Sequence, residues 1–168
     1  MTDTSRSDTI IGIDFGTSNS CIAVWQFHRS EIVANNLGSR LTPSVVYPDG
    51  DNTLVGQAAK QMAAKEPERT IFRPKRFIGR SFDDPVVQEM KPLLPYNIIN
   101  HHGLPFIEIN QRVTSDDETT TSSSTAVIEY KKHIYSAIDI SSYIFSNLLY
   151  FSIGIFIILN KLSYIPNV

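Results

Sequence analysis

The chain has 168 residues, about the length of one domain. Hydrophobic residues make up 42% and charged residues 19%, which excludes a wholly disordered chain, and the net charge of −2 predicts no nucleic-acid partner. A single cysteine, Cys21, excludes an internal disulfide framework and a zinc site built from cysteine pairs. Residues 1–9 are polar and predicted to be disordered; they lack the apolar run of a secretory signal, so a cytoplasmic location is expected.

Residues 10–109 alternate short β-rich runs with turn residues, a pattern typical of an α/β protein that contains hairpins. The first two runs are separated by Gly16-Thr17-Ser18-Asn19, which predicts a hairpin turn. Good helix formers predict a helix over 55–65, and Asp83-Asp84-Pro85 predicts the start of a second, shorter one. The predicted strands are 10–15, 21–27, 31–34, 44–47, 96–100 and 105–109.

Two later segments differ in composition. Residues 114–125 contain nine serines or threonines and three acids, which predicts a mobile, solvated loop rather than a cluster of phosphorylation sites. Residues 140–160 carry no charge, and this apolar tail is predicted to be helical. Its length suffices to cross a bilayer, but a helix buried against protein explains the composition comparably well, so both alternatives stay open.

The strongest local signal for chemistry is the segment 11–21. An apolar strand ends in Asp14, and Gly16 is expected to allow a tight turn with positive φ and a close approach of backbone N–H groups to a ligand. The hydroxyls of Thr17 and Ser18 follow, and Asp14 is placed to hold waters of a Mg²⁺ ion. The pattern predicts a phosphate-binding hairpin; the alternative is an ordinary hairpin with an acid near its turn.

This segment resembles the first phosphate motif of the actin-like ATPase superfamily, and specifically of the 70-kDa heat-shock chaperones (Hsp70/DnaK type). Two further stretches are similar to the same family. Residues 35–46 resemble its second hairpin and turn, and residues 55–60 followed by 74–84 resemble the segment that carries its catalytic lysine. Because three such segments occur in the same order as in this family, residues 10–90 resemble it as a whole.

The resemblance implies a role for each matching residue. Asp14 matches the family's aspartate near the magnesium ion, held through water, and Lys75 matches the lysine that contacts the γ-phosphate and helps to orient the attacking water. Residues 16–19 match the turn around the β- and γ-phosphates of ATP or ADP: Gly16, Thr17, Ser18 and Asn19, with Ser18 replacing a common threonine. Without the resemblance, Lys75 would be read as one more surface cation.

The resemblance also implies a fold and a function. Residues 10–149 are expected to form an incomplete actin-like ATPase (ribonuclease H-like) lobe, with a mixed sheet and β-hairpins, and residues 150–168 an unrelated tail. The chain is then an amino-terminal fragment of an ATP-dependent chaperone, with unfolded polypeptides, J-domain co-chaperones and nucleotide-exchange factors as partners of the full-length family. The sequence contains only one wall of the family's nucleotide cleft, so the isolated chain is expected to bind ATP poorly and to hydrolyse it negligibly.

Two alternatives belong to other functional classes. A sugar or acetate kinase-like member of the same superfamily would share the Asp14-x-Gly16-Thr17 turn, but would not be expected to carry the Lys75 segment. A membrane-anchored interaction protein without enzymatic activity would insert residues 143–159 into the bilayer.

Overall fold

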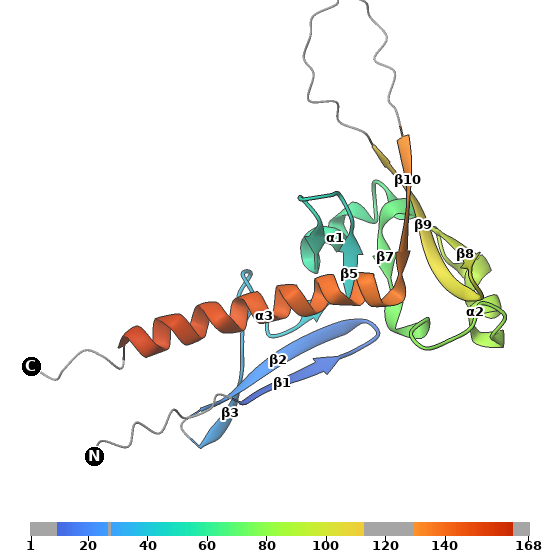
Figure 1. The fold of residues 1–168 in the computed structure, drawn as a ribbon. Coiled ribbons are helices and arrows are strands. Elements are labelled where there is room, and N and C mark those ends of the chain that lie inside the picture. The colour runs from blue at the N-terminus through green and yellow to red at the C-terminus, as the bar shows by residue number, and fades with distance from the viewer. Residues whose placement is uncertain (1–9, 27, 113–129, 163–168) are drawn as a thin grey trace, which may run out of the picture.

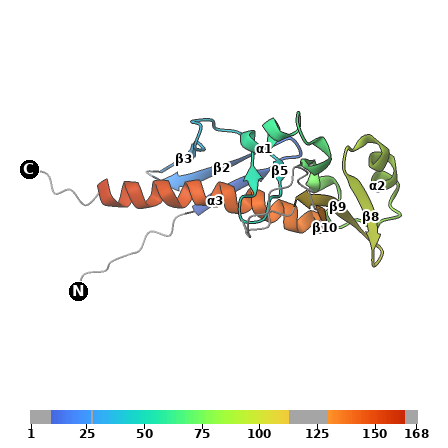
Figure 2. The ribbon, with the colours of Figure 1, turned by 90° about the horizontal axis from the view of Figure 1, so that it is seen from above.

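The computed structural model describes residues 10–26, 28–112 and 130–162. The polar start at residues 1–9, the Ser/Thr-rich loop at 114–125 and the last tail residues, 163–168, lie outside the described residues. The described part consists of small antiparallel sheets arranged along one long helix, α3 (Figures 1 and 2).

The first sheet contains the hairpin predicted from the Gly16–Asn19 turn. β1 (Ile10–Phe15) pairs antiparallel with β2 (Asn19–Gln26), and β2 also pairs with β3 (Arg29–Ile32) and β4 (Thr42–Pro43). Side chains alternate along β2, so that Ile22 and Val24 are buried while Trp25 is half exposed on the other face. The predicted strands 10–15, 21–27 and 31–34 are therefore confirmed with small shifts of their ends.

Two further sheets, each three-stranded, complete the β-structure of the described residues. One pairs β5 (Val45–Tyr47) with β6 (Leu54–Val55) and β7 (Ile71–Phe72); the other has the order β10 (Tyr130–Ser136), β9 (Leu104–Arg112), β8 (Asn97–His101). Every ladder between these strands is antiparallel, which corrects the prediction of one mixed sheet. The loops that join β5 to β6 and β8 to β9 are too short for the crossover that parallel neighbours require.

Two short helices lie between the sheets. α1 (Gln57–Met62) begins later than predicted, because Val55 pairs with Val46 in a strand and Gly56 has a positive φ of 74°, which is not helical. α2 (Pro85–Met90) begins as predicted: the Asp84 carboxylate accepts a hydrogen bond from the Val86 amide. The short 3₁₀ turns η1 (Pro67–Arg69), η2 (Pro74–Arg76) and η3 (Lys91–Leu93) complete this region.

The predicted apolar helix is α3 (Ala137–Leu162), which follows β10 directly. Its start is a capping box: the Ser136 amide donates to the Asp139 carboxylate, and the Asp139 amide donates to the Ser136 hydroxyl. The helix runs without interruption through residue 150, where the tail was predicted to begin. No helix among the described residues combines the length and the hydropathy that a membrane span needs.

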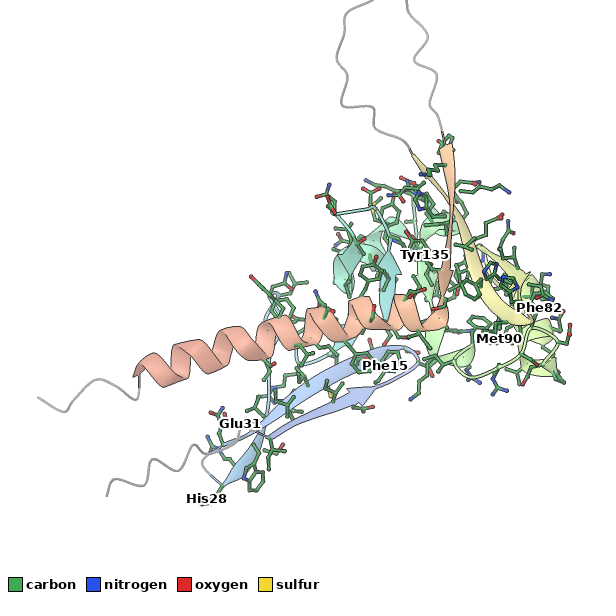
Figure 3. All side chains as sticks on the ribbon, in the orientation of Figure 1. Phe15, His28, Glu31, Phe82, Met90 and Tyr135 are labelled. Atoms are coloured by element: carbon green, nitrogen blue, oxygen red, sulfur yellow. The ribbon has the colours of Figure 1, made fainter. Side chains whose placement is uncertain are left out.

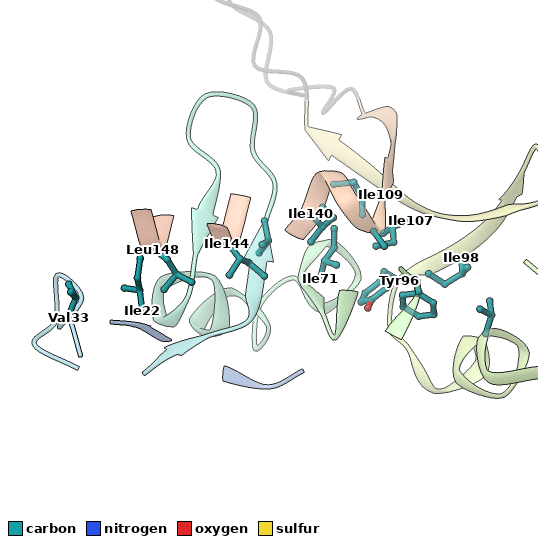
Figure 4. Packing of buried hydrophobic residues seen from close by; sticks show 14 of the residues in the cluster. Ile22, Val33, Ile71, Tyr96, Ile98, Ile107, Ile109, Ile140, Ile144 and Leu148 are labelled. Atoms are coloured by element: carbon teal, nitrogen blue, oxygen red, sulfur yellow. The ribbon is translucent and has the colours of Figure 1, made fainter. Parts of the chain in front are cut away.

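The hydrophobic core lies where α3 crosses the sheets (Figure 4). Ile140, Ile144 and Leu148 recur every four residues on one face of α3 and are at most 2% exposed. They belong to one cluster with residues of all three sheets, including Ile22 and Ile107. The first half of α3 is therefore an integral part of the fold, which favours the buried helix over the membrane span for these residues.

A buried arginine connects the second sheet to η1. The Arg69 side chain donates to the Glu66 carboxylate at 2.6 Å and to the Asp49 carboxylate at 3.0 Å, and its guanidinium lies 4.7 Å from the centroid of the Tyr47 ring. The Tyr47 hydroxyl donates to the same Glu66 carboxylate. These contacts satisfy most of the polar atoms of a residue that is only 5% exposed.

Tyr47 makes the stability of the fold sensitive to alkaline pH. Burial, and secondly the hydrogen bond to Glu66, raise the pKa of Tyr47 to about 12 from 10.0. Because the pKa is higher in the folded than in the unfolded state, this contribution is fully present below pH 10 and is lost as pH rises through about 12. Urea unfolding between pH 9 and 12 is therefore expected to show a smaller loss of stability for Tyr47→Phe than for the wild type, whereas Tyr150→Phe, on an exposed part of α3, should behave as wild type.

Candidate functional site

The tip of the β1–β2 hairpin requires a glycine. A Cβ atom added at Gly16 would lie 2.1 Å from the backbone oxygen of Asn19, a separation that no real Cβ atom tolerates. Its φ is not in the left-handed region, so the prediction of a positive φ at Gly16 is wrong. The residue is needed because the backbone folds tightly back on itself, not because of its dihedral angle.

Ser44 holds the tip in this conformation. Its hydroxyl donates to the Gly16 carbonyl oxygen at 2.8 Å and lies 2.9 Å from the Ser20 hydroxyl, and its amide donates to the Ser18 carbonyl oxygen. Both serines are 1% exposed, so water does not compete for these bonds. Ser44 lies in the family-like segment 35–46, but a serine after Thr42-Pro43 gives no local signal of this role.

Lys75 reaches the same tip from a position 60 residues further along the chain. The turn η2 carries it there, and its ammonium group donates to the Phe15 carbonyl oxygen at 2.6 Å. The Phe15 ring packs against Phe145 of α3, with ring centroids 4.9 Å apart. Figure 3 shows Phe15 beside α3. The helix thus supports the tip, and an exposed lysine lies beside it.

The remaining predicted site residues lie around the tip. Thr17 is half-buried and Ser18 and Asn19 are exposed. Asp14 is exposed on β1, in register with Cys21, so strand alternation directs its side chain to the opposite face of the sheet from Phe15. The structure therefore gathers Gly16–Asn19 and Lys75 at one place and puts Asp14 next to it on the other face.

The chemistry of the tip suits an anion. It combines hydroxyls, a tightly folded backbone and a compact ammonium group, which are the groups that bind phosphate oxygens. Among the described residues, no group of three or more His, Cys, Asp or Glu side chains is placed to hold a metal ion. A magnesium ion would therefore have to rely on Asp14, on water and on the ligand's own oxygens.

The fold and the site define an α/β domain with an exposed hairpin tip whose groups suit an anion. The family described as Hsp70 protein matches residues 10–138. The chain is also similar to a heat shock protein of Pyricularia oryzae, with 39% identity over 130 residues, which is 77% of this chain and 21% of that relative. The chain belongs to the Hsp70 family, as the three motifs predicted, and the kinase-like alternative finds no support.

Proposed function

We propose that residues 10–149 form part of the nucleotide-binding domain of an Hsp70-type chaperone, within an actin-like, ribonuclease H-like first lobe. In this proposal the hairpin tip binds the phosphates of ATP or ADP. The observation that supports phosphate binding at the tip is the contact between the Lys75 ammonium group and the Phe15 carbonyl oxygen. A lysine whose role was implied by family resemblance alone thus donates to the residue immediately before the predicted phosphate turn, Gly16–Asn19.

Each residue of the tip has a physical role in this proposal. Gly16 lets the backbone of the tip close tightly against Asn19, and Thr17, Ser18 and Asn19 offer hydroxyl and amide donors to a phosphate. Lys75 would exchange its contact with Phe15 for a γ-phosphate oxygen and neutralise part of its charge. Asp14 would hold magnesium through water; a bound magnesium ion neutralises the charge that develops on the phosphates.

We extend this proposal to the activity of the whole protein; the chain spans 21% of the length of the curated relative that it matches. The activity is ATP hydrolysis coupled to the binding and release of unfolded polypeptides, in the cytoplasm. J-domain co-chaperones and nucleotide-exchange factors are the proposed partners. Residues 150–168, beyond the family match, are proposed to be an unrelated apolar tail, of which residues 150–162 lie in α3.

The test is a titration of the 168-residue chain with Mg·ATP, followed by backbone amide shifts in NMR spectra. We expect shifts at residues 16–19 and a Kd weaker than about 1 µM, because the tip is open to water. Lys75→Met is expected to weaken binding by about three- to tenfold, the loss of one charge-assisted hydrogen bond at an exposed site.

Lys131→Met is the matched control for this titration. It removes one exposed positive charge from β10, on a different sheet from the tip. If Lys131→Met and Lys75→Met weakened Mg·ATP binding equally, the effect would come from the net charge of the chain. That result would contradict the proposed role of Lys75. Shifts that leave residues 16–19 unmoved would contradict the site itself.

A further inference from the structure

A pocket of about 300 Å³ adjoins the hairpin tip, and Lys75 is not among the residues that line it. Its polar lining comes from the tip, from Ser44 and from two cations on separate elements, Lys60 of α1 and Arg73 just before η2. Val45 and Phe72 of the second sheet contribute apolar surface. The tip residues that line the pocket are Thr17, Ser18 and Asn19.

Both charged side chains that line this pocket, Lys60 and Arg73, are positive. Neither Lys60 nor Arg73 forms an ion pair with a carboxylate among the described residues, and no described acid lines the pocket. The side-chain hydroxyls of Thr17 and Ser18 have no hydrogen bond to another described residue either. Two positive charges and free hydroxyl donors around one hollow favour an anion, and the planar guanidinium suits a phosphate group.

Arg73 is held in an uncommon conformation at this place. Its φ of 58° and ψ of 35° lie in the left-handed region, which few non-glycine residues adopt. Its guanidinium lies 5.9 Å from the centroid of the Phe72 ring, so the side chain follows a wall of the pocket. The Arg73 backbone is thus strained in the conformation that places its guanidinium at the pocket.

We propose that this pocket is a second anion site, in which Arg73 and Lys60 bind a phosphate group beside the tip. This inference rests on the proposed function, because both sites share the tip. It adds Arg73 and Lys60 to Lys75 as cations beside the tip. The phosphate group is either free inorganic phosphate or a phosphoryl group of the nucleotide; the chemistry that binds it is the same.

The probe is inorganic phosphate, titrated into the 168-residue chain at constant ionic strength against chloride, with amide shifts of residues 17–19 as the readout. Arg73→Asn, which tolerates the left-handed backbone, and Lys60→Gln on the exposed side of α1 are each expected to weaken phosphate binding by about three- to tenfold. Arg76→Asn, in the same turn but not lining the pocket, should bind as wild type.

A parallel titration with Mg·ATP identifies the source of the phosphate group. If Arg73→Asn weakens both ligands, the group belongs to the nucleotide; if it weakens inorganic phosphate alone, the pocket takes a free anion, and either result supports the site. Unchanged phosphate affinity in both Arg73→Asn and Lys60→Gln, or no shift at residues 17–19 with phosphate, would overturn it. If only Lys75→Met weakens phosphate binding, the pocket is refuted and the proposed function stands. If the chain binds phosphate but not ATP, the proposed function is refuted and the pocket stands.

Discussion

Gly16→Ala is expected to destabilise the folded chain by at least about 2 kcal/mol, because the backbone of the tip must move to accept one methyl group. The added Cβ would lie 2.1 Å from the Asn19 oxygen, and this neighbour is backbone, which cannot rotate away as a flexible side chain would. The movement would also break the bond from Ser44 to the Gly16 carbonyl oxygen. Urea denaturation gives the stability, and the amide shifts of residues 17–19 report the displaced turn.

Gly12→Ala is the matched control, four residues earlier in the same hairpin. Nothing lies within 4 Å of a Cβ atom at Gly12, and its φ is not left-handed. This variant should be as stable as the wild type or more stable by up to about 1 kcal/mol, since alanine loses less conformational freedom on folding than glycine. Equal stability of the Gly16 and Gly12 variants would show that the tip is not closed as described.

The second large effect is expected at Ile144 in α3. Its side chain is fully buried between α3 and the sheets, so Ile144→Ala should cost about 2–5 kcal/mol in lost burial and an unfilled cavity. Circular dichroism of the helix and fluorescence of Trp25, the chain's single tryptophan, should report one common transition in urea. Both signals should shift to lower urea together, because α3 supports the first sheet.

Ile138→Ala on the same helix is the comparison. Ile138 is 66% exposed, so this variant should differ from the wild type by no more than about 0.5 kcal/mol. If both variants had the same small effect, α3 would be an appended tail rather than part of the core. A helix signal that melts separately from Trp25 would lead to the same conclusion.

Local patterns in the sequence were sufficient for most of the elements. Alternating apolar residues around Gly16–Asn19 predicted the first hairpin, and Asp84 with Pro85 predicted the start of α2, as the structure confirms. Strand alternation, capping and turn preference depend on a residue and its near neighbours, so they can be predicted from the chain alone. The same holds for membership of the Hsp70 family, which three short motifs in order predicted and the family match confirms.

The sequence by itself thus determined the first hairpin, the start of α2 and the family. Only the tertiary structure decided that Lys75 meets Phe15, that Ser44 supports the tip, and that Gly16 is required by contact rather than by its φ. Each of these depends on segments 28 to 60 residues apart, or on how tightly a turn closes. Local preferences do not encode such distances; they arise when α3 packs on the sheets and holds the hairpin, β5 and η2 around one core.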